Sequence, residues 1–99
     1  MITVGRVVLY HISHSDADEI NRHRNSNTAH TDMWPSGAQA HVGNTVYNGD
    51  TFPMIVCRVW GDSGLINGQV FLDGNDTYWA TSRHEGTNPG DWEWPQRVE

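Results

Sequence analysis

The stretch FPMIVCRVWGDSGLINGQVFLDGNDTYWATS, residues 52–82, decides the fold class of this 99-residue chain. It contains three segments rich in β-branched and aromatic residues, which predict strands over 52–60, 69–72 and 77–82. The separators GDSG (61–64) and DGND (73–76) consist of residues that favour tight turns, and Gly, Asn and Asp also reach positive φ at low cost. Pro53 stands near the start of its strand, where a missing N–H is tolerated. This half of the chain therefore predicts neighbouring antiparallel strands.

The flanking sequence adds one helix and up to three more strands. Residues 5–12 (GRVVLYHI), 39–43 and 91–94 have strand-like composition. Between the first two, Ser15 or Asp16 can cap a helix over about 16–25, and 25–37 is expected to be loop. We expect a single α+β domain over 1–99. Its predicted architecture is a small curled antiparallel sheet or SH3-like barrel of five to six strands, with one short N-terminal helix.

Alternation along these strands predicts which side chains form the core. The apolar set comprises Val7, Leu9, Val42, Ile55, Cys57, Val59, Val70, Leu72 and Ala80. Cys57 is expected to be an inert core thiol. Trp92 and Trp94 lie two residues apart on one strand and are expected to close the core or to contact another subunit. Because a short final strand leaves a sheet edge to cover, we expect a homo-oligomer, with a dimer as the simplest form.

Charge and composition exclude several classes of function. The chain carries 12 carboxylates against 6 basic side chains, all of them Arg, for a net charge of −6. This balance opposes binding to duplex nucleic acid, which depends on phosphate neutralisation. No apolar run is long enough for a membrane span. The single Cys57 excludes an internal disulfide and is compatible with a reducing cytosol, so we expect a cytoplasmic protein.

Polar residues on the predicted strands suggest a pocket for a small nucleotide-like ligand. Amides, a carboxylate and an imidazole suit a purine edge and ribose hydroxyls, and the residues with these groups are Gln39, His41, Asn44, Gln69 and Asp73. Arg22 and Arg24 suit a phosphate, and Trp60 or Trp79 can stack on a base. The alternative is that these residues bind no ligand. The polar residues would then be ordinary exposed residues of the sheet, the two arginines a solvated helix end, and the tryptophans packing residues.

Signals for catalysis or metal binding are weak. His11 and His14, with Asp16 and Asp18 nearby, follow no metal-binding motif. We predict no metal and no cofactor, and the pattern favours binding over catalysis. A hydrolase using His11, His14 or His41 with Asp73 is the enzymatic alternative.

Five strings together resemble a family of short proteins of tailed bacteriophages and prophages. They are INRHR, WPSGAQAHVGN, GDTFPMIVCRVW, NGQVFLDGNDTYW and PGDWEWPQRV. The resemblance runs from the first strand to the last and is weakest over 25–33. Some small acidic phage proteins are anti-defence factors that sequester nucleotide immune signals, including cyclic ADP-ribose isomers and cyclic dinucleotides. The resemblance therefore implies a viral protein that acts in the host bacterial cytosol by sequestering such a signal without turnover. A phage accessory or structural protein-interaction module is the alternative.

Overall fold

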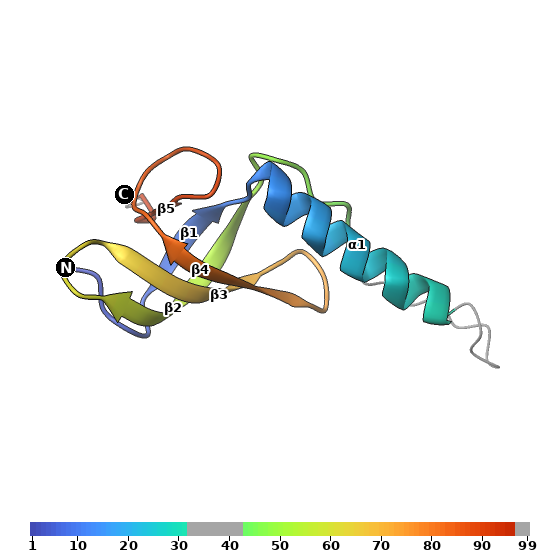
Figure 1. The fold of residues 1–99 in the computed structure, drawn as a ribbon, viewed down its shortest axis with the longest axis horizontal. Helices are drawn as coiled ribbons and strands as arrows, with labels where there is room; N and C mark the ends of the chain where they lie inside the picture. The colour runs from blue at the N-terminus through green and yellow to red at the C-terminus, as the bar shows by residue number, and fades with distance from the viewer. Residues whose placement is uncertain (32–42, 97–99) are drawn as a thin grey trace.

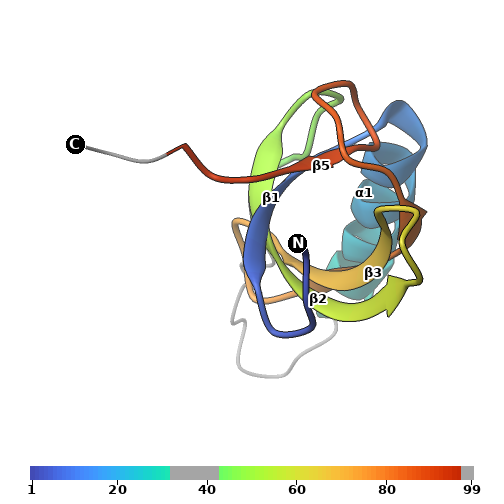
Figure 2. The same ribbon diagram turned by 90° about the vertical axis from the view of Figure 1, so that its left-hand side faces the viewer.

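The computed structural model describes residues 1–31 and 43–96, which form one helix and a five-stranded antiparallel sheet (Figure 1). The elements are β1 (Val7–His11), α1 (His14–Thr31), β2 (Thr51–Trp60), β3 (Leu65–Phe71), β4 (Thr77–Arg83) and β5 (Trp92–Glu93). The strand order is β4-β3-β2-β1-β5. The sheet curls strongly but does not close into a barrel (Figure 2). Helix α1 begins beside the open side of the sheet and extends away from it (Figure 1). The predicted α+β class is confirmed. The expected strand at 39–43 lies outside the described residues.

Helix α1 begins with a reciprocal capping box. Ser13 Oγ accepts a hydrogen bond from the Asp16 backbone N–H at 3.1 Å, and Asp16 Oδ2 accepts one from the Ser13 N–H, also at 3.1 Å. The cap is therefore Ser13, not Ser15 or Asp16 as the sequence suggested. The helix also extends to Thr31, beyond the predicted end near residue 25.

The core lies between the inner face of the curled sheet and the first turns of α1. It contains the buried apolar residues Val8, Tyr10, Ile12, Ala17, Ile20, Val46, Met54, Val56, Ile66, Val70, Leu72, Ala80 and Trp92. Trp92 is the largest of them, and its indole N–H donates to the Gly64 carbonyl at 3.0 Å. Trp92 therefore closes the core, whereas Trp94 is 37% exposed and packs edge-on against the Trp92 ring.

The predicted register is wrong by one residue in β1 and β2. Val7 and Ile55 are exposed and their neighbours Val8, Met54 and Val56 are buried instead. Cys57 is also exposed, so it is not a core thiol, and Leu9 and Val59 are only partly buried. The prediction is confirmed for Val70, Leu72 and Ala80, and Val42 lies outside the described residues.

Two β-bulges surround one polar residue on the outer face of the sheet. The register shifts between Val56 and Arg58 on β2, and again where β4 pairs with β3 between Ile66 and Gly68. Between them, Asn67 Oδ1 accepts hydrogen bonds from the Ser82 N–H at 2.7 Å and from the Trp60 indole N–H at 3.0 Å. Ser82 has a φ of 55°. Asn67 therefore satisfies a backbone group that the bulge removes from the ladder.

Candidate functional site

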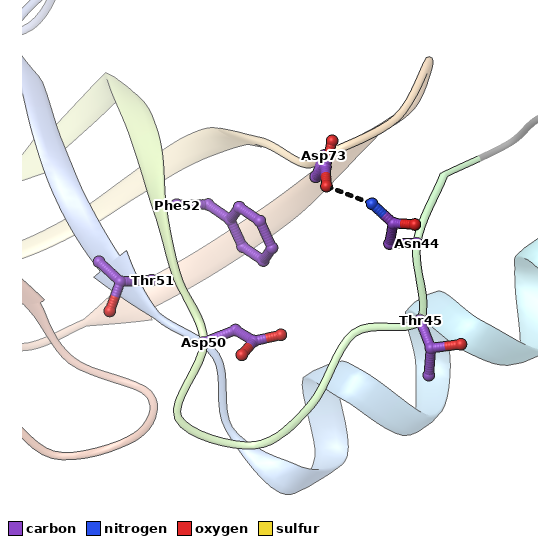
Figure 3. A pocket seen from close by; sticks show the side chains of 6 residues that line it. All are labelled: Asn44, Thr45, Asp50, Thr51, Phe52 and Asp73. Atoms are coloured by element: carbon purple, nitrogen blue, oxygen red, sulfur yellow. Dashed lines mark hydrogen bonds between the residues drawn. The ribbon is translucent and has the colours of Figure 1, made fainter.

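A cavity of about 330 Å³ lies at one end of the inner sheet face, where the segment before β2 meets the turn after β3 (Figure 3). Its lining residues are Asn44, Thr45, Asp50, Thr51, Phe52 and Asp73. The Phe52 ring points into the space between the Asp50 carboxylate and the Asn44–Asp73 pair. Asn44 Nδ2 donates to Asp73 Oδ2 at 2.6 Å, so the two side chains form one fixed polar wall. The sequence predicted both members of this wall as ligand-binding residues, but it did not predict Phe52.

Helix α1 positions this wall through two polar side chains. Asn21 forms a pair of hydrogen bonds with the backbone of Val46: Nδ2 donates to its carbonyl at 2.8 Å and Oδ1 accepts from its N–H at 3.1 Å. One turn later, Arg24 Nη1 donates to the Asn44 carbonyl. These contacts hold a segment without regular secondary structure against a rigid helix, so the pocket wall is preorganised.

The close approach of Gly43 and Asp73 explains why glycine stands at the start of this segment. The Asn44 N–H donates to the Asp73 carbonyl at 3.2 Å, and Gly43 forms an isolated bridge with Gly74. A Cβ atom on Gly43 would lie 2.3 Å from the Asp73 carbonyl oxygen, and its φ of 145° disfavours L side chains. The backbone contact that shapes the pocket therefore requires glycine at this position.

The pocket is rich in hydrogen-bond acceptors. Asp50 Oδ2 accepts from the Tyr47 N–H at 2.9 Å, and Asp73 Oδ2 accepts from Asn44. Among the described residues, none donates to the second oxygen of either carboxylate, which can therefore accept a hydrogen bond from a ligand. No Arg is among its lining residues. The site suits a small planar group that carries N–H or O–H donors, and it opposes a phosphate placed inside it.

The two arginines expected at a phosphate site do not form one. Arg24 is buried, and its Nε and Nη2 donate to Asp76 Oδ2 and Oδ1, both at 2.8 Å. This bidentate hydrogen bonding, which outweighs the opposing effect of burial, raises the pKa of Arg24 above its ordinary value. Arg24 thus supports the pocket wall from behind. Arg22 is exposed on the helix surface.

The other predicted ligand residues are distributed over different surfaces. Gln69 and Trp79 are cross-strand neighbours on the outer face of the sheet. Trp60 lies on the same side of the sheet, over Asn67, with the Arg58 guanidinium 4.9 Å from its ring centroid. Gln39 and His41 lie outside the described residues.

A second cavity, of about 360 Å³, separates β4 from the middle of α1. Trp79 contributes to its wall, together with Glu19 and His23 of the helix and Asp76 of the β3–β4 turn. Two carboxylates, of Glu19 and Asp76, also line this second cavity, and among the described residues neither cavity has an Arg in its lining to bind a phosphate.

The sequence did not predict the buried polar cluster around Asp16. Only 2% of Asp16 is exposed, and its carboxylate accepts hydrogen bonds from Tyr10 Oη, from Tyr78 Oη at 2.8 Å and from Arg83 Nη2 at 3.0 Å. Burial alone would raise the pKa of Asp16, but hydrogen bonds from Tyr10, Ser13 and Tyr78 outweigh it and hold the pKa below its ordinary value. Burial, together with the hydrogen bond to Asp16 and its negative charge, in turn raises the pKa of both Tyr10 and Tyr78. The cluster joins the start of α1 to β1 and β4, and the capping pattern Ser13-x-x-Asp16 was its only signal in the sequence.

The histidines proposed for a hydrolase are engaged elsewhere. His11 Nδ1 lies 2.9 Å from Thr51 Oγ1, and His11 Nε2 lies 2.5 Å from Glu93 Oε2. His14 Nε2 lies 3.4 Å from Asp18 Oδ2 on the exposed side of the helix. Within residues 1–31 and 43–96, no group of three or more His, Cys, Asp or Glu side chains is arranged to hold a metal ion.

Comparison with protein-family models, with curated proteins and with solved structures finds no match to this chain. In the part that the structure describes, no helix is long and apolar enough to cross a membrane.

Proposed function

We propose that the protein is a small binding protein that holds the nucleoside part of a nucleotide-type ligand without turning it over. The observation that carries this proposal is the Asn44–Asp73 pair facing the Phe52 ring across the 330 Å³ pocket. An aromatic ring next to fixed acceptors combines the two elements that recognise a base: stacking, worth about 1–3 kcal/mol, and hydrogen bonds to its edge.

The size and charge of the pocket define the ligand further. A volume of about 330 Å³ is at the lower end of small-molecule sites, which suits one base with its sugar. Only one nucleoside unit of a cyclic dinucleotide or of an ADP-ribose derivative would enter the pocket. Because the carboxylates of Asp50 and Asp73 border the pocket, the phosphate would remain outside in solvent.

The acceptor-rich wall favours guanine among the bases. Guanine presents N1–H and N2–H₂ as adjacent donors, whereas the corresponding edge of adenine offers one amino group beside a ring acceptor. The second oxygens of Asp73 and Asp50 can each accept one of these guanine hydrogen bonds. We therefore expect guanosine to bind more tightly than adenosine, and guanosine monophosphate to bind no more tightly than guanosine.

The resemblance to short phage proteins supports a biological context for such binding. In an infected cell, a protein that binds a nucleotide immune signal and leaves it intact lowers the free concentration of that signal. Sequestration in the host cytosol is the role that we propose on this basis.

Calorimetric titration with guanosine, adenosine and guanosine monophosphate tests the proposal. Asp73→Asn keeps the shape of the wall and removes an ionised acceptor, so guanosine affinity should fall at least tenfold, a loss of about 1.5–3 kcal/mol. Asp62→Asn, in the exposed β2–β3 turn, is the matched control and should leave affinity unchanged.

Phe52→Leu tests the stacking role of the ring, since leucine retains apolar contact with the core but offers no aromatic face. Chromatography of the recovered ligand distinguishes binding from cleavage. Equal guanosine affinity in the parent and Asp73→Asn proteins, no binding of any nucleoside, or a cleaved product would contradict the proposal.

A further inference from the structure

We infer that the outer face of the sheet binds a second copy of this chain, which forms a two-fold symmetric dimer. The outer sheet face is defined here by Val7, Leu9, Pro53, Ile55, Gln69, Phe71, Thr77 and Trp79. These residues form two rows across the sheet, one through the pairs Val7–Ile55, Ile55–Gln69 and Gln69–Trp79, the other through Leu9–Pro53 and Phe71–Thr77. This surface is independent of the nucleoside pocket.

The outer sheet face exposes large apolar side chains. Val7 is 52% exposed, Trp79 46% and Phe71 43%, and Ile55 is 36% exposed. Alternation along the strands explains this arrangement, because their neighbours Val8, Met54, Val70 and Ala80 fill the core from the opposite face. Apolar side chains gathered on one face of a sheet mark a surface that packs against another molecule.

The area matches the apolar part of one standard interface. Together, the exposed parts of Val7, Ile55, Phe71 and Trp79, with smaller contributions from Leu9 and Pro53, amount to about 400 Å² of apolar surface. One partner of a standard interface buries about 800 Å², of which about 500 Å² is apolar in a homodimer. The face thus supplies most of what a stable dimer requires. Area alone does not identify the occupant, because monomers also carry patches of this size.

The polar groups of the face identify the occupant as a second copy. Gln69 and Thr77 each both donate and accept hydrogen bonds, so each can pair with its own symmetry mate. None of the eight residues is charged, although the chain has a net charge of −6. The nearest charged side chains lie at the margins of the face: Glu93 pairs with Leu9 on the β5 side and contacts His11, and Arg58 lies beside the Trp60 ring. A two-fold contact centred on Gln69 therefore places no ionised group against its like in its middle, which a contact through the acidic surfaces of α1 or of the β3–β4 turn would do.

Gln69 offers the sharpest test, because it lies on β3 between Ile55 and Trp79, in the middle of the face. Gln69 is only partly exposed, and its side chain is absent from the core. In a symmetric dimer, Gln69→Glu places two carboxylates together and Gln69→Lys places two ammonium groups together. Each variant alone should dissociate, and an equimolar mixture of the two should form a heterodimer. Thr87→Glu, in the exposed loop before β5, is the control for added charge.

Sedimentation velocity over a range of protein concentrations measures the result, with far-UV circular dichroism to confirm that each variant is folded. We expect the parent and Thr87→Glu proteins to reach twice the chain mass of 11.2 kDa. We expect each Gln69 variant to weaken dimerisation at least tenfold, and their mixture to restore it. A parent protein that stays monomeric at high micromolar concentration overturns the inference. So does a dimer that both Gln69 variants leave intact, because it would use another surface.

Discussion

Replacing Arg24 by alanine should destabilise the fold, because Arg24 holds three segments together. Its guanidinium donates twice to Asp76 of the β3–β4 turn and once to the Asn44 carbonyl, and the side chain itself belongs to α1. Its side chain is only 7% exposed, whereas that of Asp76 is 27% exposed. Removing one partner of a buried ion pair costs about 3–5 kcal/mol. Since water can partly rehydrate Asp76 after the substitution, we expect a loss of about 3 kcal/mol.

Urea denaturation followed by tryptophan fluorescence, at one fixed protein concentration, measures this loss as a change in the free energy of unfolding. Arg22→Ala is the matched control: it removes the same charge two residues earlier on the same helix, from an exposed site, and should change stability by less than about 0.5 kcal/mol. Asp76→Ala and the double variant complete a thermodynamic cycle, with an expected coupling energy of about 1–2 kcal/mol.

Equal stability of the Arg24→Ala and Arg22→Ala proteins would refute this assignment of Arg24. It would mean that the Arg24 guanidinium is solvated and available to a ligand, as the sequence suggested. A coupling energy near zero would in turn show that Arg24 stabilises the fold through contacts other than Asp76.

Two further predictions concern the buried carboxylate and the strand register. The pKa of Asp16 in the folded protein lies below its ordinary value of 3.8, so the ionised carboxylate contributes its full stabilisation above that pH. This stabilisation disappears as the pH falls through the folded-state pKa. Asp16→Asn should therefore cost about 2 kcal/mol near neutral pH, and the difference in urea midpoint between the variant and the parent should shrink in acid. A constant difference at every pH would contradict this. Met54 is buried and Ile55 is exposed, so Met54→Ala should cost about 2–5 kcal/mol of unfolding free energy and Ile55→Ala less than about 1 kcal/mol in the monomer. Thermal melts measure both variants, and equal losses of stability would refute the observed register.

The sequence was sufficient to predict the element types and the β3–β4 half of the core. In that half, the polar residues Gln69 and Asp73 flank the run Val70–Leu72 and fix the phase of the alternation, so Val70 and Leu72 could be assigned to the inner face. In β1 and β2 the chain reads VVLY and PMIVC, with apolar residues at consecutive positions. Period-two alternation carries no phase information in such a run, and a one-residue error exchanges the two faces. The structure places apolar residues on both faces of these strands.

Asn44 and Asp73 could each be singled out as candidate ligand residues because both are polar and border turns or strand ends, but their contact with each other could not be predicted. The role of Arg24 could not be predicted either, since its partner Asp76 is 52 residues away in the chain and only the folded topology brings them together. The same limit applies to Asp16, whose contacts with Tyr78 and Arg83 join the helix start to the far edge of the sheet. The observed helix α1 is also longer than predicted, because the run of weak helix formers after residue 24 suggested that the helix ends earlier.

The position of Trp92 has a consequence for protein synthesis. Its backbone pairs with Tyr10 across 82 residues, and its buried ring fills the core between early and late parts of the chain. While the ribosome adds residues at about 5–20 per second, the nascent chain can form the hairpins of β2, β3 and β4 but leaves an opening where this indole belongs. The nine residues from the end of β4 to Trp92 take about 0.5–2 s to add, and chaperones and proteases can bind the incomplete chain for that time. A chain truncated before Trp92 would have an open core and a short lifetime in the cell.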